Sequence, residues 1–296
     1  MSLLDPKVLA KLGNTQLRAR AVVEGVLSGL HRSPHQGQSV EFAEHKDYAA
    51  GDDLRHLDWK AWGKLDRYYV KRFEQETNLR AFLVVDASAS MGYRGDPERL
   101  SKLAYAQTLA ASFGYLLVRQ QDAVGVVVAR GKELGYLPPR AALGHLPAIL
   151  GTLEAAAATG PTDLAAAADL VAEKAGRRAN VFVFSDLLDF SPGAMRRLAD
   201  LRRMKHEVAI FHLLDPDELD FPFEDATRFE GLEGEPALEV DPRSIRASYL
   251  EELDAFCTEA KQTCERADVE YELVRTDAHL DRLLLRFLAR RGGGRR

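Results

Sequence analysis

Asp86, Ser88 and Ser90 place one carboxyl and two hydroxyl groups at alternate positions, directly after an apolar run of the chain. Two further oxygen-bearing side chains stand at similar breaks in the sequence, Thr162 ahead of a helix-like segment and Asp186 after another apolar run. Hard divalent cations such as Mg²⁺ prefer oxygen ligands in an octahedral arrangement. The five side chains therefore predict a metal site for Mg²⁺, and the sequence leaves Mn²⁺ and Ca²⁺ open as alternatives.

These side chains can meet only if the strands that precede them lie in one sheet. Five short apolar runs are typical of strands, at residues 80–88, 122–130, 179–187, 206–215 and 269–277. Helical patterns lie around them, at about residues 97–119, 140–153, 163–176, 192–203, 243–267 and 279–290. The alternation predicts a doubly wound α/β fold with a mainly parallel sheet, and in such sheets ligands bind at the carboxyl ends of the strands.

Two segments stand outside this alternation. Residues 5–30 have apolar residues at helical spacing with an interruption near Gly13, which indicates one or two helices. Residues 227–242 contain two short extended pieces around a Gly-rich turn, which predicts a hairpin. We expect an N-terminal segment of residues 1–79 that packs on a main domain of residues 80–291, followed by a frayed tail at 292–296.

Charge decides what else the predicted metal site could bind. Two carboxylates only just neutralise a divalent cation, so a coordination position left open would favour an acidic group from another molecule. A purely structural role is the alternative, because Asp and Ser are ordinary helix caps and turn formers, and Thr162 with Asp163 could merely start the next helix. A metal site is the preferred interpretation, because three helix caps would have to occur by chance in this order and with these residue types.

Composition narrows the class of protein. Of 296 residues, 46% are apolar, which is enough for a full core, and 40 basic against 45 acidic residues leave a net charge of −5 with no general attraction for nucleic acid. Cys257 and Cys264 fall on one expected helix, where about 10 Å of rise separates them, too far for a disulfide. No apolar stretch is long enough for a membrane span and the N-terminus has no apolar signal core, so we expect a cytoplasmic protein.

The site residues resemble a known pattern. The von Willebrand factor type A domain carries a metal-ion-dependent adhesion site (MIDAS) of the form Asp-x-Ser-x-Ser, then a Thr, then an Asp on separate loops. Asp86, Ser88, Ser90, Thr162 and Asp186 match every position in order. The resemblance implies a von Willebrand type A fold, which is Rossmann-like, and a metal-dependent interaction with an acidic residue of a protein partner.

A second resemblance lies ahead of the first strand, in the stretch YAAGDDLRHLDWK. It is similar to the signature of the bacterial family called domain of unknown function fifty-eight, from about residue 15 to the C-terminus. The matching residues are Tyr48, Gly51, Asp52, Asp53, Arg55, Asp58, Trp59 and Lys60, followed by Val70, Lys71, Phe73 and Glu74. This resemblance implies a short member without membrane helices that works as an adaptor with a MoxR-type AAA+ ATPase, or with a client of that ATPase, in protein assembly or metal insertion.

Enzymatic alternatives are weaker. A Mg²⁺-dependent phosphohydrolase could use Asp86 as a nucleophile, but the second Asp of such a motif is here Ser88. The chain has no Gly-x-Ser-x-Gly elbow, no phosphate-binding P-loop and no His-Glu-x-x-His metal motif. The aromatic and basic residues of 55–72 raise the possibility of nucleic-acid binding, which the near balance of charge over residues 52–80, with seven basic and six acidic residues, disfavours.

Turnover of a generic phosphoester separates the adaptor from the phosphohydrolase. If the chain is an interaction module, the purified protein should show no Mg²⁺-dependent hydrolysis above background, because such a module has no need of a nucleophile that attacks a phosphoester. Steady metal-dependent turnover that Asp86→Asn abolishes would reverse this assignment. Salt-sensitive retention on DNA would instead support the nucleic-acid alternative.

Overall fold

The computed structural model describes residues 6–32, 46–47, 69–70, 79–130, 133–188 and 191–293. The chain forms two compact units, one of residues 1–31 with 78–296 and another of residues 32–77. In the smaller unit the described residues are two short antiparallel strands, β1 (Lys46–Asp47) and β2 (Tyr69–Val70). Of the signature residues matched ahead of the first strand, all but Val70 lie outside the described residues, and the domain boundary expected near residue 80 stays a prediction.

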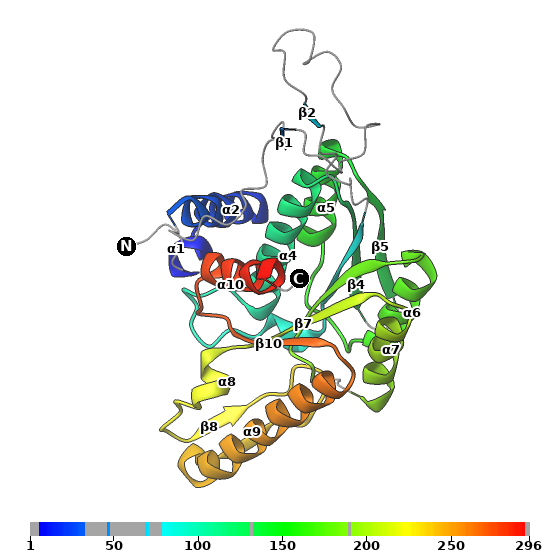
Figure 1. Ribbon diagram of the computed structural model, residues 1–296. Helices are drawn as coiled ribbons and strands as arrows, with labels where there is room; N and C mark the ends of the chain where they lie inside the picture. The colour runs from blue at the N-terminus through cyan, green and yellow to red at the C-terminus, as the bar shows by residue number, and fades with distance from the viewer. Residues whose placement is uncertain are drawn as a thin grey trace. The chain divides into compact units, whose positions relative to one another are not determined.

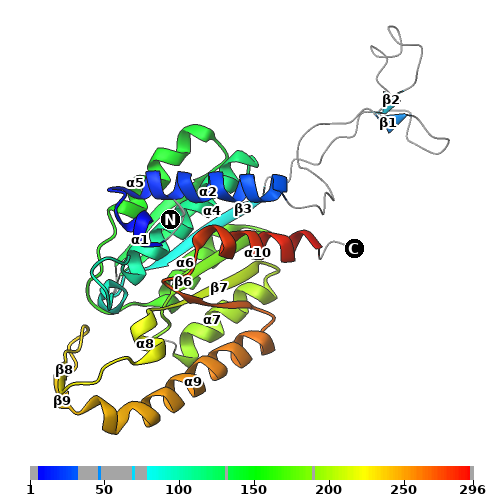
Figure 2. The same cartoon turned by 90° about the vertical axis from the view of Figure 1, so that its left-hand side faces the viewer.

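The larger unit is built on one six-stranded sheet. Its strands are β3 (Arg80–Asp86), β4 (Ala123–Arg130), β5 (Glu133–Arg140), β6 (Ala179–Ser185), β7 (Glu207–Leu214) and β10 (Glu270–Arg275). They lie in the order β10-β7-β6-β3-β4-β5, and all neighbours are parallel except β4 and β5. Helices cover both faces (Figures 1 and 2), so the predicted α/β fold with a mainly parallel sheet is confirmed.

The helices divide between the two faces. Their bounds are α1 (Pro6–Ala10), α2 (Thr15–Arg32), α4 (Lys102–Arg119), α5 (Leu146–Glu154), α6 (Leu164–Ala175), α7 (Pro192–Arg203), α8 (Pro216–Asp220), α9 (Pro242–Arg266) and α10 (Leu280–Gly293). The core against one face takes side chains from α1, α2, α4, α5 and α10, and the core against the other takes them from α6, α7 and α9. A hairpin of β8 (Thr227–Phe229) and β9 (Leu238–Val240) precedes α9.

The central strand shows why both faces are apolar. Along β3, Leu83 and Val85 belong to one core and Phe82 and Val84 to the other, because successive side chains of a strand point to opposite faces. All four are nearly inaccessible to solvent. A strand covered by helices on both sides must be apolar at every position, which is the pattern that made these runs recognisable in the sequence.

Aromatic rings fill the centre of the first core. Phe113 of α4 lies 4.8 Å from Phe182 of β6 and 5.3 Å from both Phe211 of β7 and Phe287 of α10, measured between ring centroids. Aromatic pairs at such distances add to the stabilisation that burial itself provides. Phe113 therefore ties two central strands to the C-terminal helix.

Differences from the sequence prediction occur where local signals are weak. The sequence pattern predicts no strand at β5, which contains Pro138 and Pro139. Proline has no N–H to donate to a neighbouring strand, so a β-sheet accepts it only in an edge strand such as β5. Helix α4 begins at Lys102 rather than near residue 97, because the side chain of Ser101 accepts a hydrogen bond from the N–H of Ala104 and caps it. The five-residue helix α8 is too short for a periodic pattern.

Cys257 and Cys264 both lie on α9 and both are free thiols, as expected from their spacing. None of the helices that the structure describes is apolar enough over sufficient length to cross a membrane.

Replacing the central aromatic ring tests this core. Phe113→Ala should lower the free energy of unfolding by about 3–5 kcal/mol, because it removes buried area and leaves a cavity among four other rings. Urea denaturation followed by circular dichroism measures the change. The control is Leu143→Ala, whose side chain is 69% exposed and should shift stability by less than about 0.5 kcal/mol; equal losses in both variants would contradict the packing described.

Candidate metal-binding site

Asp86 ends β3 and organises the loop that follows it. One carboxylate oxygen, Oδ1, accepts a hydrogen bond from the backbone N–H of Ser88 at 2.9 Å, and Oδ2 accepts one from the Ser185 hydroxyl at 2.5 Å. The hydroxyls of Ser88 and Ser90 lie 3.0 Å apart. A short 3₁₀ helix over Ala89–Gly92 then carries Ser90 inward. The alternate acid and hydroxyls of the sequence thus form one hydrogen-bonded group.

The loop that carries Thr162 is attached to the Asp86 loop by backbone hydrogen bonds. The N–H of Ala89 donates to the carbonyl of Gly160 at 2.8 Å, and the N–H of Thr159 donates to the carbonyl of Ala87 at 3.0 Å. Gly160 has φ +64°, a left-handed conformation that glycine adopts without strain. The close approach of two loops from distant parts of the chain places Thr162 next to the serine loop.

Thr162 itself does not act as the cap of α6. The side chain of Asp163 accepts a hydrogen bond from the N–H of Ala166 and fills that role. The hydroxyl oxygen of Thr162 is buried and has no hydrogen-bond partner among the residues that the structure describes. A buried polar atom without a partner costs free energy, so either a buried water molecule or a ligand such as a cation must satisfy it.

The carboxylate of Asp186 contacts a buried lysine, Lys102, and not the hydroxyl groups of the serine loop. The ammonium of Lys102 lies 2.8 Å from Asp186 Oδ2 and 2.7 Å from Glu218 Oε1, and the Lys102 side chain is completely buried. Burial lowers the pKa of Lys102, but the charges of Asp186 and Glu218 outweigh this effect and the pKa is raised overall. Burial also raises the pKa of Glu218, which the ammonium offsets only in part. We take the lysine as charged because two carboxylates contact it.

The negative charge of Asp86 is not fully compensated by the groups around it. Burial, together with the negative charge of Asp186, raises the pKa of Asp86 to about 6, despite hydrogen bonds from Ser185 and Ser88 that act in the opposite direction. A cation close to both carboxylates would relieve this repulsion. The arrangement therefore has the negative charge, the hydroxyl oxygens and the buried Thr162 oxygen that a hard divalent cation requires.

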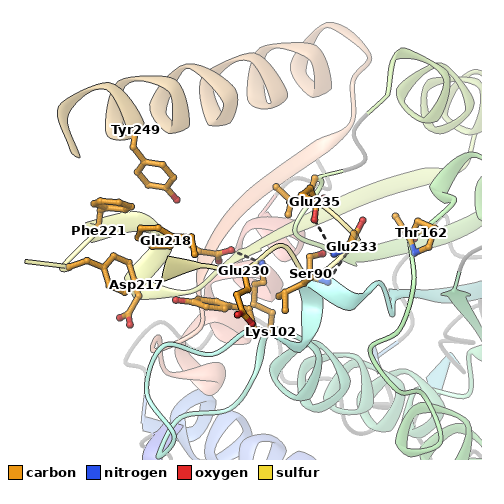
Figure 3. A pocket seen from close by; sticks show the side chains of 16 residues that line it. Ser90, Lys102, Thr162, Asp217, Glu218, Phe221, Glu230, Glu233, Glu235 and Tyr249 are labelled. Carbon is orange, nitrogen blue, oxygen red and sulfur yellow. Dashed lines mark hydrogen bonds and ion pairs between the residues drawn. The ribbon is translucent and has the colours of Figure 1, made fainter. Parts of the chain in front are cut away.

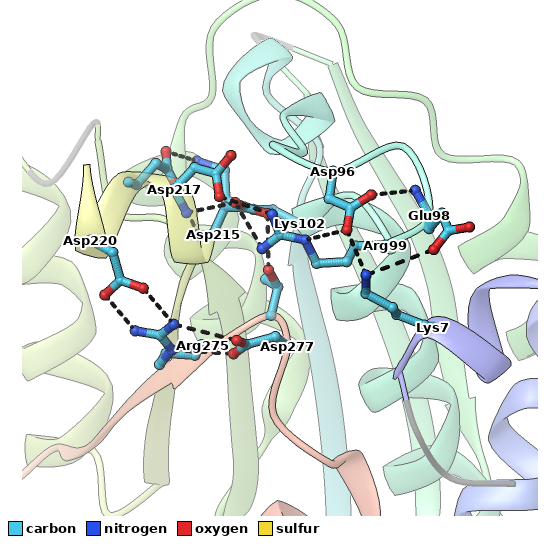
Figure 4. Close-up of polar contacts among 12 residues, drawn as sticks. Lys7, Asp96, Glu98, Arg99, Lys102, Asp215, Asp217, Asp220, Arg275 and Asp277 are labelled. Carbon is cyan, nitrogen blue, oxygen red and sulfur yellow. Dashed lines mark hydrogen bonds and ion pairs between the residues drawn. The ribbon is translucent and has the colours of Figure 1, made fainter. Parts of the chain in front are cut away.

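Ion pairs hold α8, and with it Glu218, beside the site. Asp215 caps α8 through a capping box with Glu218. Arg99 contacts Asp217 at 2.9 Å and Asp215 at 3.5 Å, and it also reaches Asp96, which pairs with Lys7 at 2.8 Å (Figure 4). Arg99 is only 11% exposed, so this network is more rigid than an ordinary surface pair. It links α1 to the helix that supplies Glu218.

A pocket of about 500 Å³ opens over the site (Figure 3). Ser90, Thr162 and Lys102 line its inner part, and acidic and aromatic side chains of α8, the hairpin and α9 line the rest. Asp86 and Asp186 do not line the pocket and are essentially inaccessible to solvent. Two of the five predicted residues, Ser90 and Thr162, thus line the pocket, and the two carboxylates lie buried outside its lining.

The structure brings the five predicted residues to one end of the sheet. Asp86, Ser88 and Ser90 are joined by hydrogen bonds, Thr162 shares the pocket with Ser90, and Asp186 is close enough to raise the pKa of Asp86. Their assignment as metal ligands stays a prediction. Over the described ranges no group of three or more His, Cys, Asp or Glu side chains is placed to hold a metal ion, and the predicted set contains two acids, Asp86 and Asp186.

Sequence reasoning missed Lys102, Glu218 and also Glu233, whose carboxylate accepts a hydrogen bond from the backbone N–H of Ser90. Lys102 could have been noticed, because it lies on the apolar stripe of α4 with Tyr105, Ala106 and Leu109 at helical spacing, where a charge must have a buried partner. Glu218 and Glu233 belong to a short helix and a turn far from the site along the chain, and no local pattern pointed to either of them.

Comparison with known proteins supplies the family. Residues 44–256 match the family described as Protein of unknown function DUF58. The "Uncharacterized protein Rv1480" of Mycobacterium tuberculosis is 27% identical over 297 residues, an alignment that covers 98% of this chain and 92% of that protein.

Solved structures similar to this chain include two of low sequence identity. The conserved hypothetical protein BatB from Bacteroides thetaiotaomicron has a TM-score of 0.47 at 14% identity, over 73% of this chain and 100% of that one. The SpRpn10 VWA domain has a TM-score of 0.42 at 9% identity, over 70% and 93%. The fold assignment above rests on the sheet order and the flanking helices themselves.

The buried lysine provides a direct test of the electrostatics. Lys102→Met should lower the free energy of unfolding by about 3–5 kcal/mol, because it leaves Asp186 and Glu218 buried without the ammonium. Chemical denaturation in the presence of a chelator measures the loss. The matched control is Lys174→Met, which removes an exposed pair with Glu173 and should change stability by less than about 1 kcal/mol. Similar values for both variants would show that the buried ammonium is not required.

Proposed function

Because the chain belongs to the family described as Protein of unknown function DUF58 and carries the oxygen-bearing side chains of a metal site, we propose that it is a metal-dependent protein-interaction module. Mg²⁺, or else Mn²⁺ or Ca²⁺, would be held by Asp86, Ser88, Ser90, Thr162 and Asp186. A cation bound there would offer a coordination position to a carboxylate oxygen of a partner. The main support is Thr162, a residue that lines the same pocket as Ser90 and whose buried hydroxyl has no hydrogen-bond partner among the described residues.

The residues around the proposed metal would have three different roles. Ser90 and Thr162 line the pocket and would contribute hydroxyl oxygens to the metal, and Asp86 and Asp186 would supply negative charge from the buried side. Lys102 compensates part of that charge, so the metal-free protein does not carry two unrelieved buried carboxylates. The complete burial of Asp86 disfavours the phosphohydrolase alternative, because a nucleophile must reach its substrate.

The partner is proposed from the family resemblance. A MoxR-type AAA+ ATPase, or a client protein of that ATPase, would present the acidic residue, and the chain would act as an adaptor in protein assembly or metal insertion. The proposal places this interaction in the cytoplasm and involves neither nucleic acid nor membrane. It also requires no catalytic residue in the chain.

Metal-dependent stabilisation tests the site. Mg²⁺ at about 100 times its dissociation constant should stabilise the wild-type chain by about 2.7 kcal/mol, since it binds only the folded state. Asp86→Ala should abolish this stabilisation, because one of the two carboxylates is lost. Thermal unfolding in Mg²⁺ and in chelator measures both, and a pull-down with the candidate ATPase should depend on Mg²⁺ and on Asp86 in the same way.

The matched control is Asp122→Ala. Asp122 is also a buried acid whose pKa burial raises to about 6, but it precedes β4 and lies at the amino ends of the parallel strands, away from the carboxyl ends that carry the site. It should keep the full Mg²⁺ effect. Stabilisation by Mg²⁺ that survives in Asp86→Ala, or partner binding that is unchanged in chelator, would count against the proposal.

A further inference from the structure

The turn of the β8–β9 hairpin sends one acidic side chain into the site. Oε1 of Glu233 accepts a hydrogen bond from the backbone N–H of Ser90 at 3.3 Å, across 143 residues of sequence. Every other residue of the turn, 230–237, is exposed, and Glu233 alone is half-buried. Figure 3 shows the side chain reaching from the hairpin toward Ser90. The turn thus brings a carboxylate to one of the predicted metal ligands.

The hairpin is held in place by aromatic packing. The ring of Phe229 on β8 stacks on Phe221 at 5.7 Å and meets Phe223 edge-on at 5.2 Å, and Phe221 also contacts Tyr249 of α9 at 4.5 Å. Within the turn, the N–H of Glu233 donates to Glu235 Oε2 at 3.1 Å, and Gly234 has φ +104°, which favours glycine. These contacts direct the Glu233 carboxylate toward the sheet.

Glu233 differs from its acidic neighbours in its partners. Glu230 pairs with Arg228 at 3.2 Å, and Glu218 pairs with Lys102. Glu233 has no ion pair among the residues that the structure describes, although it is half-buried. The Glu233 carboxylate is therefore free of competing ion pairs within the described residues and is available to a cation at the serine loop.

The pocket contains the groups needed to bind a cation together with this carboxylate. Ser90, Thr162 and Glu233 line the same space, and the Thr162 hydroxyl is buried without a partner among the described residues (Figure 3). The ammonium of Lys102 already compensates part of the charge of Asp186, so a cation at the serine loop retains positive charge that attracts the Glu233 carboxylate, which in the present arrangement forms no three-acid group with Asp86 and Asp186. Carboxylate oxygens are also preferred ligands of hard divalent cations, so Glu233 has the right chemistry for this position.

We propose that Glu233 is itself a ligand of the bound cation, and that it fills the coordination position that a partner's acid would otherwise occupy. This inference rests on the metal site proposed above. Because the hairpin tethers Glu233 to the site, its effective concentration lies in about the millimolar range or higher. A partner must therefore displace the hairpin, and not only present an acidic side chain, to reach the metal.

Mn²⁺ binding to the purified full-length chain tests the assignment. Isothermal titration gives the affinity, and the relaxation of water protons gives the number of exchangeable waters on Mn²⁺. Glu233→Gln should weaken Mn²⁺ binding about 10-fold, since even groups outside the first shell change metal affinity by this factor. It should also add one exchangeable water, which acetate then displaces in the variant and not in the wild type.

Glu239→Gln is the matched control, because it removes the same charge from the same hairpin at an exposed position of β9 that does not line the pocket. Its Mn²⁺ affinity should stay within about twofold of the wild type. Phe229→Ala, which releases the hairpin from its aromatic contacts, should reproduce the extra water of Glu233→Gln. Unfolding midpoints in chelator establish that each variant is folded.

The two proposals fail in different ways. If Glu233→Gln binds Mn²⁺ as the control does and gains no water, Glu233 is not a ligand, while the metal site stands. If the wild type and Asp86→Ala are equally unable to bind Mn²⁺, the metal site is wrong and this inference falls with it.

Discussion

The parallel pairing of β3 with β6 sets the central constraint on this molecule. Val85 lies opposite Phe184 in the sheet, so the next residues bring Asp86 beside Ser185 and Asp186. Two carboxylates are thereby buried close together where water cannot screen their repulsion. The site must include positive charge at this point, and the structure supplies Lys102 as one source of it. The remaining negative charge, together with the buried Thr162 oxygen, suits the divalent cation proposed.

Segments far from the site in the sequence supply the charged groups that surround these two carboxylates. Helix α8 is short, yet its capping box and its pairs with Arg99 fix it so that Glu218 completes the coordination of the Lys102 ammonium. Aromatic rings hold the β8–β9 hairpin next to the same pocket. The polar groups around the predicted site therefore come from elements that contribute little to the central sheet, and their position depends on a few specific contacts.

The sequence was sufficient to predict the central strands of the sheet but not its edge strand β5. Strands β3, β6 and β7 are continuous apolar runs, because helices cover both of their faces, and short runs of this kind are typical of buried parallel strands. Strand β5 was missed, since Pro138 and Pro139 argue against a strand and only its edge position makes them acceptable. Within the site, the spacing of Asp86, Ser88 and Ser90 was visible as a local pattern, whereas the partners of these residues were not.

By itself, the sequence determined the fold class and which oxygen-bearing side chains follow the central strands. Periodicity and motif spacing are local properties, and a parallel sheet gathers strand ends in any case. Only the tertiary structure decided which charges meet there. Lys102 reaches Asp186 across 84 residues and Glu218 across 116, and Glu233 reaches Ser90 across 143. Contacts at such separations depend on the order of strands and on the packing of short segments, which no local pattern encodes.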